Sequence, residues 1–151
     1  MRGYERHELE RRAWATSAEI RGWFPEAATR EFLRRAIANA RKAGLEERTG
    51  FPFGAVIVDR DGSVVADGSN HVTANFDPTA HAEVQAIRAA CAARRTFRLE
   101  GCILFSSSEP CPMCLAAACW AGVDGVIFAA TAADAATING FDDAFLYRQF
   151  A

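Results

Sequence analysis

The chain has 151 residues, of which half are apolar and 24% are charged, and its formal net charge is −2. This length suits a single domain with a sizeable core, and the slightly acidic balance argues against broad electrostatic binding of nucleic acid. No apolar run approaches the roughly 18 residues of a membrane span, and the charged first residues are not typical of a secretory signal. Five cysteines, an odd number, suit metal ligands and core residues in a reducing cytoplasm better than a disulfide framework.

Residues 1–27 are predicted to form a helical extension. Arginines and glutamates are mixed along it, which is typical of a solvated helix with ion pairs one turn apart. Four large apolar side chains between Trp14 and Phe24 indicate that the extension docks on another surface, and Pro25 ends it. We therefore expect two parts, the extension and one domain over residues 28–151.

The rest of the chain alternates helices and strands. Apolar residues at helical spacing predict a helix over 26–44 that ends at Gly44, and residues 53–70 predict a hairpin that turns at Asp61-Gly62. We expect further helices over 78–95 and 112–122, strands over 102–108 and 125–130, and core positions for Cys91, Cys102, Cys119 and Trp120. This order predicts an α/β fold with three layers, α/β/α, around a mixed central sheet whose inner strands are mostly parallel.

Two short motifs bring together candidate metal ligands. His81 and Glu83 are two residues apart at the start of one predicted helix, and Cys111 and Cys114 are three residues apart at the start of the next. The partial positive charge of a helix N-terminus favours the thiolate form of cysteine, and the i,i+3 spacing places both sulfur atoms on one side of the helix. Two thiolates and one imidazole suit zinc, with three ligands from the protein.

A zinc ion with three protein ligands keeps one position for water, which is typical of catalytic rather than structural zinc. Zinc makes a hydroxide available near pH 7, and the carboxylate of Glu83 can move the protons. The four residues thus predict a zinc-dependent hydrolase with one proton shuttle. His-x-Glu followed by Pro-Cys-x-x-Cys is also the general signature of the zinc nucleobase deaminases.

From Phe32 to about Tyr147 the chain resembles the cytidine deaminase-like superfamily, and within it the small bacterial guanine deaminases. The matching stretches are PFGAVIV, DPTAHAEVQAIRAAC, SEPCPMC and GFDDAFLY. The resemblance implies that zinc hydroxide attacks C2 of guanine, with xanthine and ammonia as products. It implies zinc ligands at His81, Cys111 and Cys114, a proton shuttle at Glu83, and substrate contacts from Asn70, Phe53, Asp143 and the backbone N–H of Ala82.

The chain departs from this family at two places, its C-terminus and the N-terminal extension over residues 1–27. The family usually continues with a fifth strand and one or two C-terminal helices that close the pocket, whereas this sequence stops at Ala151, so we expect those elements to be lacking. The strand over 125–130 would then be an exposed apolar edge, which proteins usually cover. We expect a second subunit, in a homodimer, or the extension to cover it. In addition, Phe51 stands where the family has glycine, which we expect to reshape the pocket mouth.

The motifs leave several functions open. The substrate could be another amine, such as cytosine, guanosine or an s-triazine, or it could be adenosine in tRNA. The arginine cluster Arg94, Arg95 and Arg98 favours RNA, whereas the net charge argues against it. A non-catalytic zinc module that binds a partner through the extension is a third hypothesis, but such a module would need neither Glu83 nor an open coordination position.

Overall fold

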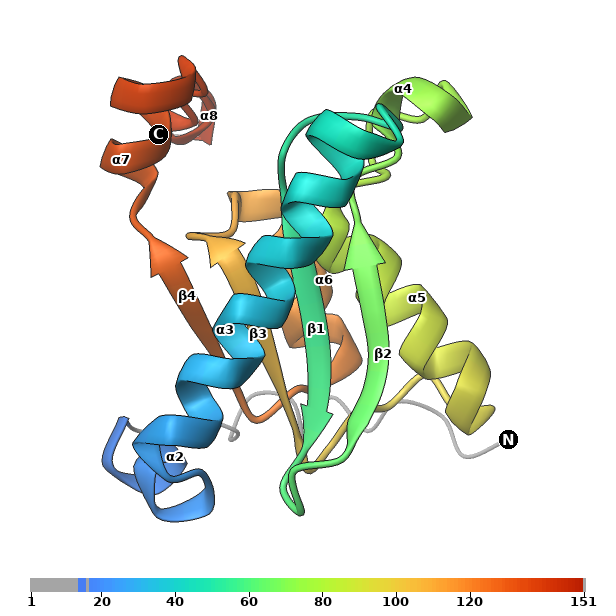
Figure 1. Cartoon of the computed structure of the whole chain (residues 1–151), viewed down its shortest axis with the longest axis vertical. Coiled ribbons are helices and arrows are strands. Elements are labelled where there is room, and N and C mark those ends of the chain that lie inside the picture. Colours follow the sequence, from blue (N-terminus) through green and yellow to red (C-terminus); the bar gives the residue numbers. More distant parts are fainter. Residues whose placement is uncertain (1–13, 16, 151) are drawn as a thin grey trace.

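The structure is a computed structural model, and it describes residues 14, 15 and 17–150. It contains a four-stranded sheet with helices on both faces (Figure 1). The strands are β1 (Gly54–Asp59), β2 (Val64–Ser69), β3 (Cys102–Ser108) and β4 (Gly125–Ala130), and their order in the sheet is β2-β1-β3-β4. The predicted three-layer arrangement around a mixed sheet is therefore confirmed.

The expectation of mostly parallel inner strands is wrong. Strand β1 is antiparallel to both of its neighbours, β2 and β3, and the parallel pair is β3 with β4. The tight turn between β1 and β2 requires the antiparallel pairing, while the helical crossover between β3 and β4 allows the parallel one. Continuous apolar runs show that both faces of a strand are buried, but they do not fix its direction.

The helices of the described chain divide between the two faces of the sheet (Figure 1). Helices α2 and α3 pack against the alternate residues Val56 and Val58 of β1, whereas α5 and α6 pack on the opposite face against Ala55 and Ile57. Within the described part of the chain, no helix combines the length and the apolar character of a membrane span. The helices are α2 (Ser17–Trp23), α3 (Glu26–Arg41), the π-helix η1 (Lys42–Glu46), α4 (Val72–Asn75), α5 (Ala82–Arg94), α6 (Pro112–Ala121), α7 (Ala132–Asn139) and α8 (Ala144–Phe150).

Part of the predicted extension belongs to the core. Ile20 and Phe24 are buried, and the ring of Phe24 lies edge-on to that of Phe105 at a centroid distance of 5.8 Å. Helix α3 begins at Glu26, so the predicted boundary at residue 27 falls in its first turn. Residues 1–13 and 16 of the extension lie outside the described residues.

Three local expectations are corrected. The helix predicted to end at Gly44 changes into η1 after Arg41, and Cys119 and Trp120 are exposed on α6 rather than buried in the core. Residues after β4 also form helices, α7 and α8, where none was expected. Thr131 starts α7 with a capping box, because its hydroxyl accepts from the Asp134 N–H while the Asp134 carboxylate accepts from the Thr131 N–H.

Candidate active site

Two helix N-termini meet at one cluster of metal-type donors. His81 is the N-cap of α5, Cys111 is the N-cap of α6, and Cys114 lies in the first turn of α6 behind Pro112. Each sulfur atom lies 3.6 Å from His81 Nδ1, and the two sulfur atoms lie 3.6 Å from each other. Ligands placed about 2.0–2.3 Å from a tetrahedral zinc ion would be separated by about 3.3–3.8 Å. The donor types and their separations therefore fit zinc.

The charges of the three donors depend on one another. Contacts with Cys114 and His81 lower the pKa of Cys111 to about 4, and the Cys111 thiolate in turn raises the pKa of His81. The pKa of Cys114 is raised, because it shares a proton with Cys111 and is buried beside Glu83. The two helix N-termini also favour the thiolate form of cysteine, which is the form that binds metal.

Glu83 lies beside this cluster, and the residue as a whole is 5% exposed. The Ser106 hydroxyl of β3 donates to Glu83 Oε1 at 2.9 Å, and the Cys114 thiol donates to Oε2 at 3.4 Å. Burial raises the pKa of Glu83 above its ordinary value. A raised pKa suits a carboxyl group that takes up a proton and then releases it, as a general acid and base must.

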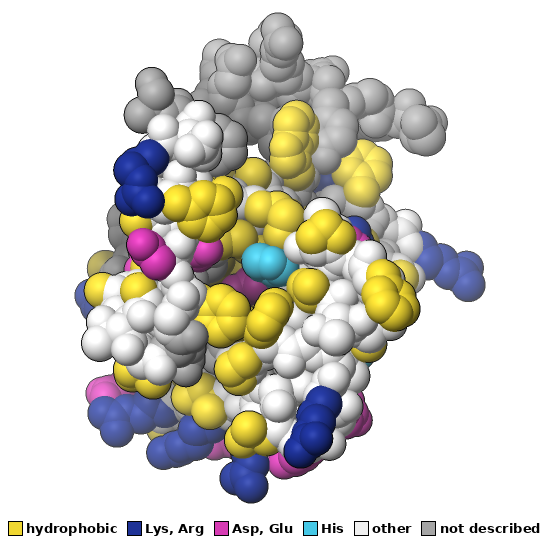
Figure 2. Space-filling model, turned by 90° about the horizontal axis from the view of Figure 1, so that it is seen from above, with side chains coloured by type: hydrophobic (Ala, Val, Ile, Leu, Met, Phe, Trp, Pro, Cys, Tyr) yellow, Lys and Arg dark blue, Asp and Glu magenta, His cyan; other side chains and the backbone are white. Residues whose placement is uncertain are grey.

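A cavity of about 470 Å³ opens beside the donor cluster. Seen from above, a histidine lies in a depression that is rimmed by apolar side chains (Figure 2). The hydroxyl of Ser108, another lining residue, is buried and has no hydrogen-bond partner among the described residues. Such a group can pair with a polar ligand. The lining residues are Phe51, Phe53, Asn70, Pro78, His81, Glu83, Ser108, Glu109, Cys111, Met113, Ala132, Ala135, Phe141, Asp143, Phe145 and Leu146.

Asn70 follows β2, lines the cavity and is 1% exposed. Its Oδ1 accepts hydrogen bonds from the backbone N–H groups of Phe51 and Val72, both at 3.2 Å. These two bonds fix the orientation of the side-chain amide. Its Nδ2 has no hydrogen-bond acceptor among the described residues, so it can donate to a ligand in the cavity.

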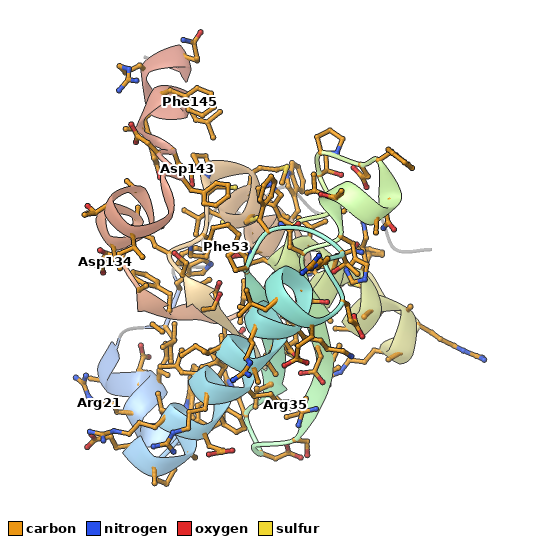
Figure 3. All side chains as sticks on the ribbon, turned by 45° about the horizontal axis from the view of Figure 1, so that its top comes forward. Arg21, Arg35, Phe53, Asp134, Asp143 and Phe145 are labelled. Atoms are coloured by element: carbon orange, nitrogen blue, oxygen red, sulfur yellow. The ribbon has the colours of Figure 1, made fainter. Side chains whose placement is uncertain are left out.

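The opposite wall comes from the segment between α7 and α8. Asp143 lines the cavity there, and burial raises the pKa of its carboxyl group. The ring of Phe53 meets that of Phe141 edge-on at 5.1 Å, and Figure 3 shows Phe53 below the C-terminal segment that carries Asp143 and Phe145. Ala82, by contrast, is fully buried at the start of α5, and its side chain does not line the cavity.

The structure adds residues that the sequence did not single out. Ser106 donates a hydrogen bond to Glu83, and Ser108 lines the cavity. Both lie in the apolar strand β3, where no sequence pattern indicated a functional role. The Glu109 carboxylate accepts from the Ala132 N–H at the start of α7, at 2.8 Å, and so links the loop before α6 to that helix. Phe141 lies in the GFDD stretch, two residues before Asp143. That closeness to a predicted substrate contact was the signal that could have identified it.

Comparisons with known proteins agree with this geometry. The guanine deaminase of Bacillus subtilis is 52% identical over 118 residues, which are 78% of this chain and 74% of that protein. The crystal structure of guanine deaminase from Bacillus subtilis matches with a TM-score of 0.75 at 50% identity, over 79% of this chain and 74% of that chain.

Two further relatives are more distant. A structure of the guanine deaminase from Nitrosomonas europaea matches with a TM-score of 0.66 at 35% identity, over 80% of this chain and 65% of that chain. A tRNA-specific adenosine deaminase of Aquifex aeolicus is 41% identical over 99 residues, which are 66% of this chain and 64% of that protein. The chain therefore spans slightly less than two thirds of the length of these two relatives.

Residues 27–130 match the family model described as the cytidine and deoxycytidylate deaminase zinc-binding region. This range includes the donor cluster and Glu83, and it confirms the resemblance inferred from the sequence. The chain belongs to the zinc-binding cytidine and deoxycytidylate deaminase family.

Proposed function

We propose that this protein is a zinc-dependent guanine deaminase, which hydrolyses guanine to xanthine and ammonia. The observation that carries the proposal is that three zinc-type donors and the buried residue Glu83 lie together beside one cavity. The 52% identity to the guanine deaminase of Bacillus subtilis supports guanine as the base.

His81, Cys111 and Cys114 would hold the zinc ion. When bound, zinc acts as a Lewis acid that lowers the pKa of its water ligand to about 7. The cluster has only three such donors within the described residues, which leaves a position for a non-protein ligand. The N-termini of α5 and α6 orient the donors, because His81 and Cys111 are the N-cap residues of these helices.

Glu83 would carry the protons. The Ser106 hydroxyl donates to Oε1, and the Cys114 thiol donates to Oε2. Cys114 would lose that proton as a zinc ligand, so Oε2 is the atom that would accept a proton from the attacking water. The same carboxyl group would then protonate a ring nitrogen and afterwards the amino group on C2, which leaves as ammonia. The water oxygen stays on C2 as the new carbonyl oxygen of xanthine, so the atoms of guanine and one water balance those of the two products.

Asn70 and Asp143 would bind the base from two sides. The Asn70 Nδ2 can donate to the O6 or N7 acceptor of guanine, and the Asp143 carboxylate can accept from its N–H donors. The Phe53 ring would form an apolar wall for the planar base, and the backbone N–H of Ala82 at the start of α5 is a further proposed contact. The hydroxyl of Ser108 is well placed to pair with a polar edge of the base.

Ammonia release from zinc-loaded protein tests the function. Guanine, guanosine, cytosine, adenine and an s-triazine amine would be compared in parallel, and a tRNA anticodon stem would be included because of the relationship to the tRNA-specific adenosine deaminase. We expect guanine to be the preferred substrate. Turnover of another amine, with guanine unchanged, would refute the choice of base while it keeps the reaction class.

The protein would act as a homodimer in the cytoplasm. Strand β4 is an edge of the described sheet and exposes Phe128, and open sheet edges are usually covered by another chain or segment. All five cysteines are free thiols, which suits a reducing compartment. Light scattering of the purified protein would test the dimer, and a monomer at micromolar concentration would contradict it.

A further inference from the structure

The wall of the cavity that carries Asp143 is weakly connected to the rest of the molecule. The two core clusters contain no described residue of α7 or α8, and these helices stand apart from the sheet beyond the end of β4 (Figure 1). Glu109 connects the start of α7 to the loop before α6. The position of Asp143, which follows α7, therefore depends on contacts at the other end of that helix.

Those contacts are aromatic. The ring of Phe141 meets the ring of Phe51 edge-on, with a centroid distance of 4.8 Å and an interplanar angle of 70°, and it meets Phe53 in the same way at 5.1 Å and 74°. We call these three residues the aromatic clasp. Since Phe141 is two residues before Asp143, the clasp joins the segment that carries Asp143 to the loop before β1.

The same loop holds Asn70 on the other side of the cavity. The Phe51 N–H donates to Asn70 Oδ1, and the Thr49 hydroxyl donates to the Asn70 carbonyl oxygen at 2.8 Å. Gly50 passes so close to Asn70 that a Cβ atom at this position would overlap it. Phe51 thus contacts Asn70 through its main-chain N–H, and through its ring it contacts Phe141 in the segment that carries Asp143.

We propose that Phe51 is a positioning residue, which holds the Asn70 amide and the Asp143 carboxylate at a fixed separation across the cavity. This inference rests on the proposed function, because it assigns to Asn70 and Asp143 the binding of the base. Phe51 is 43% exposed, so its ring is not needed to fill the core. It lines the cavity nonetheless, which places it where its loss would affect substrate binding.

The test compares Phe51→Ala with a matched control, Phe97→Ala. Phe97 is 48% exposed and lies outside the cavity, so it controls for the loss of a half-exposed ring. The alanine at position 51 keeps the N–H group that holds Asn70, so this variant removes only the ring contact. We expect the KM for guanine to rise about 3- to 10-fold, in line with the loss of aromatic contacts, while kcat changes less than about 2-fold. Phe51→Tyr, which keeps the ring, should retain the wild-type KM.

A double mutant separates a shared contact from two independent ones. If Phe51 acts through Phe141, the KM of Phe51→Ala/Phe141→Ala should exceed that of the more affected single variant by less than about 2-fold. Independent walls of a pocket would instead give effects that multiply, and that result would overturn the inference. Phe141→Ala also breaks the contact from the opposite side if Phe51→Ala fails to fold.

Hydrogen exchange gives a readout that does not depend on turnover. In zinc-loaded protein without substrate, we expect the amides of residues 141–146 to exchange faster in Phe51→Ala than in Phe97→Ala. Equal exchange, or faster exchange without any change in KM, would overturn the positioning role. If the wild-type protein deaminates none of the bases, the proposed function fails, and exchange alone then decides whether Phe51 holds this segment.

Discussion

The two ends of the cavity are built in different ways. The donor end, with His81, Glu83, Cys111 and Cys114, stands on the first turns of two helices that pack against the central sheet. The recognition end, around Asp143, stands on a segment outside the core clusters that is held by a few side chains. Bond making and breaking needs atoms placed within fractions of an ångström, which a packed core provides.

The difference indicates where substrate preference can change. A change at the donor end disturbs residues that are buried together, so it affects the chemistry itself. A change at the recognition end moves a segment with few core contacts and alters binding at a lower cost in stability. Rates and metal content should therefore respond to the donor end, and KM should respond to the recognition end.

Glu83→Gln should produce the largest effect. The amide keeps the size of the side chain but cannot move protons, so kcat should fall by about 10²- to 10⁴-fold while the zinc content stays at the wild-type level. Steady-state ammonia release, with zinc measured by atomic absorption, checks both. A variant that keeps more than about a tenth of the wild-type kcat would exclude Glu83 as the shuttle.

Cys114→Ser should produce the second largest effect, a loss of zinc affinity. Loss of a thiolate ligand should lower the zinc affinity by at least about 100-fold, which exceeds the typical effect of residues that only support ligands. Cys119→Ser on the same helix is the matched control, because Cys119 is exposed and outside the cluster. Competition with a zinc chelator measures the affinities, and equal affinities in the two variants would contradict the ligand assignment.

Asp143→Asn tests the recognition end. Loss of a charged hydrogen-bond acceptor should raise the KM for guanine by about 10- to 100-fold, with a smaller change in kcat. Asp142→Asn is the control, since Asp142 is exposed and its Oδ1 accepts from the Ala144 N–H at the start of α8, a bond that asparagine can also make. If both variants raised the KM equally, Asp143 would have no special contact with the base.

Asp67→Asn should give the smallest effect and leave both ends of the cavity intact. Arg35 donates two hydrogen bonds to Asp67, at 2.7 and 2.6 Å, and these bonds hold the pKa of Asp67 below its usual range. Both side chains are well exposed, so the variant should lower the free energy of unfolding by at most about 1 kcal/mol at neutral pH.

The pH dependence of this loss has a definite sign. A depressed pKa in the folded state stabilises the protein above the unfolded pKa of about 3.9 and loses that contribution as the pH falls through the folded value. Urea unfolding of the wild type and of Asp67→Asn should therefore differ at pH 7, and the two should converge as the pH falls through the lowered folded-state pKa of Asp67. A difference that persists in acid would mean that the carboxylate charge is not the cause.

The donor cluster could be predicted from the sequence because the geometry within each of its two pairs is local. His81 and Glu83 are two residues apart, Cys111 and Cys114 are one helical turn apart, and each pair lies at a helix start. The relative position of two side chains in one helical turn is the same however the helix packs. For the same reason the hairpin and the helices over α5 and α6 were predicted near their observed bounds.

Only the tertiary structure decided how the recognition end is made. The orientation of the Asn70 amide depends on the N–H groups of Phe51 and Val72, and the aromatic clasp joins Phe51 to Phe141, which is 90 residues later in the chain. The spacing of apolar residues along the sequence does not predict such contacts, and it did not predict that β1 runs antiparallel to β3. The sequence by itself indicated the zinc chemistry, because each pair of functional residues has its own short spacing, and the fold then brought the two pairs together. The fold decided the shape of the cavity, because that shape depends on residues that only packing brings together.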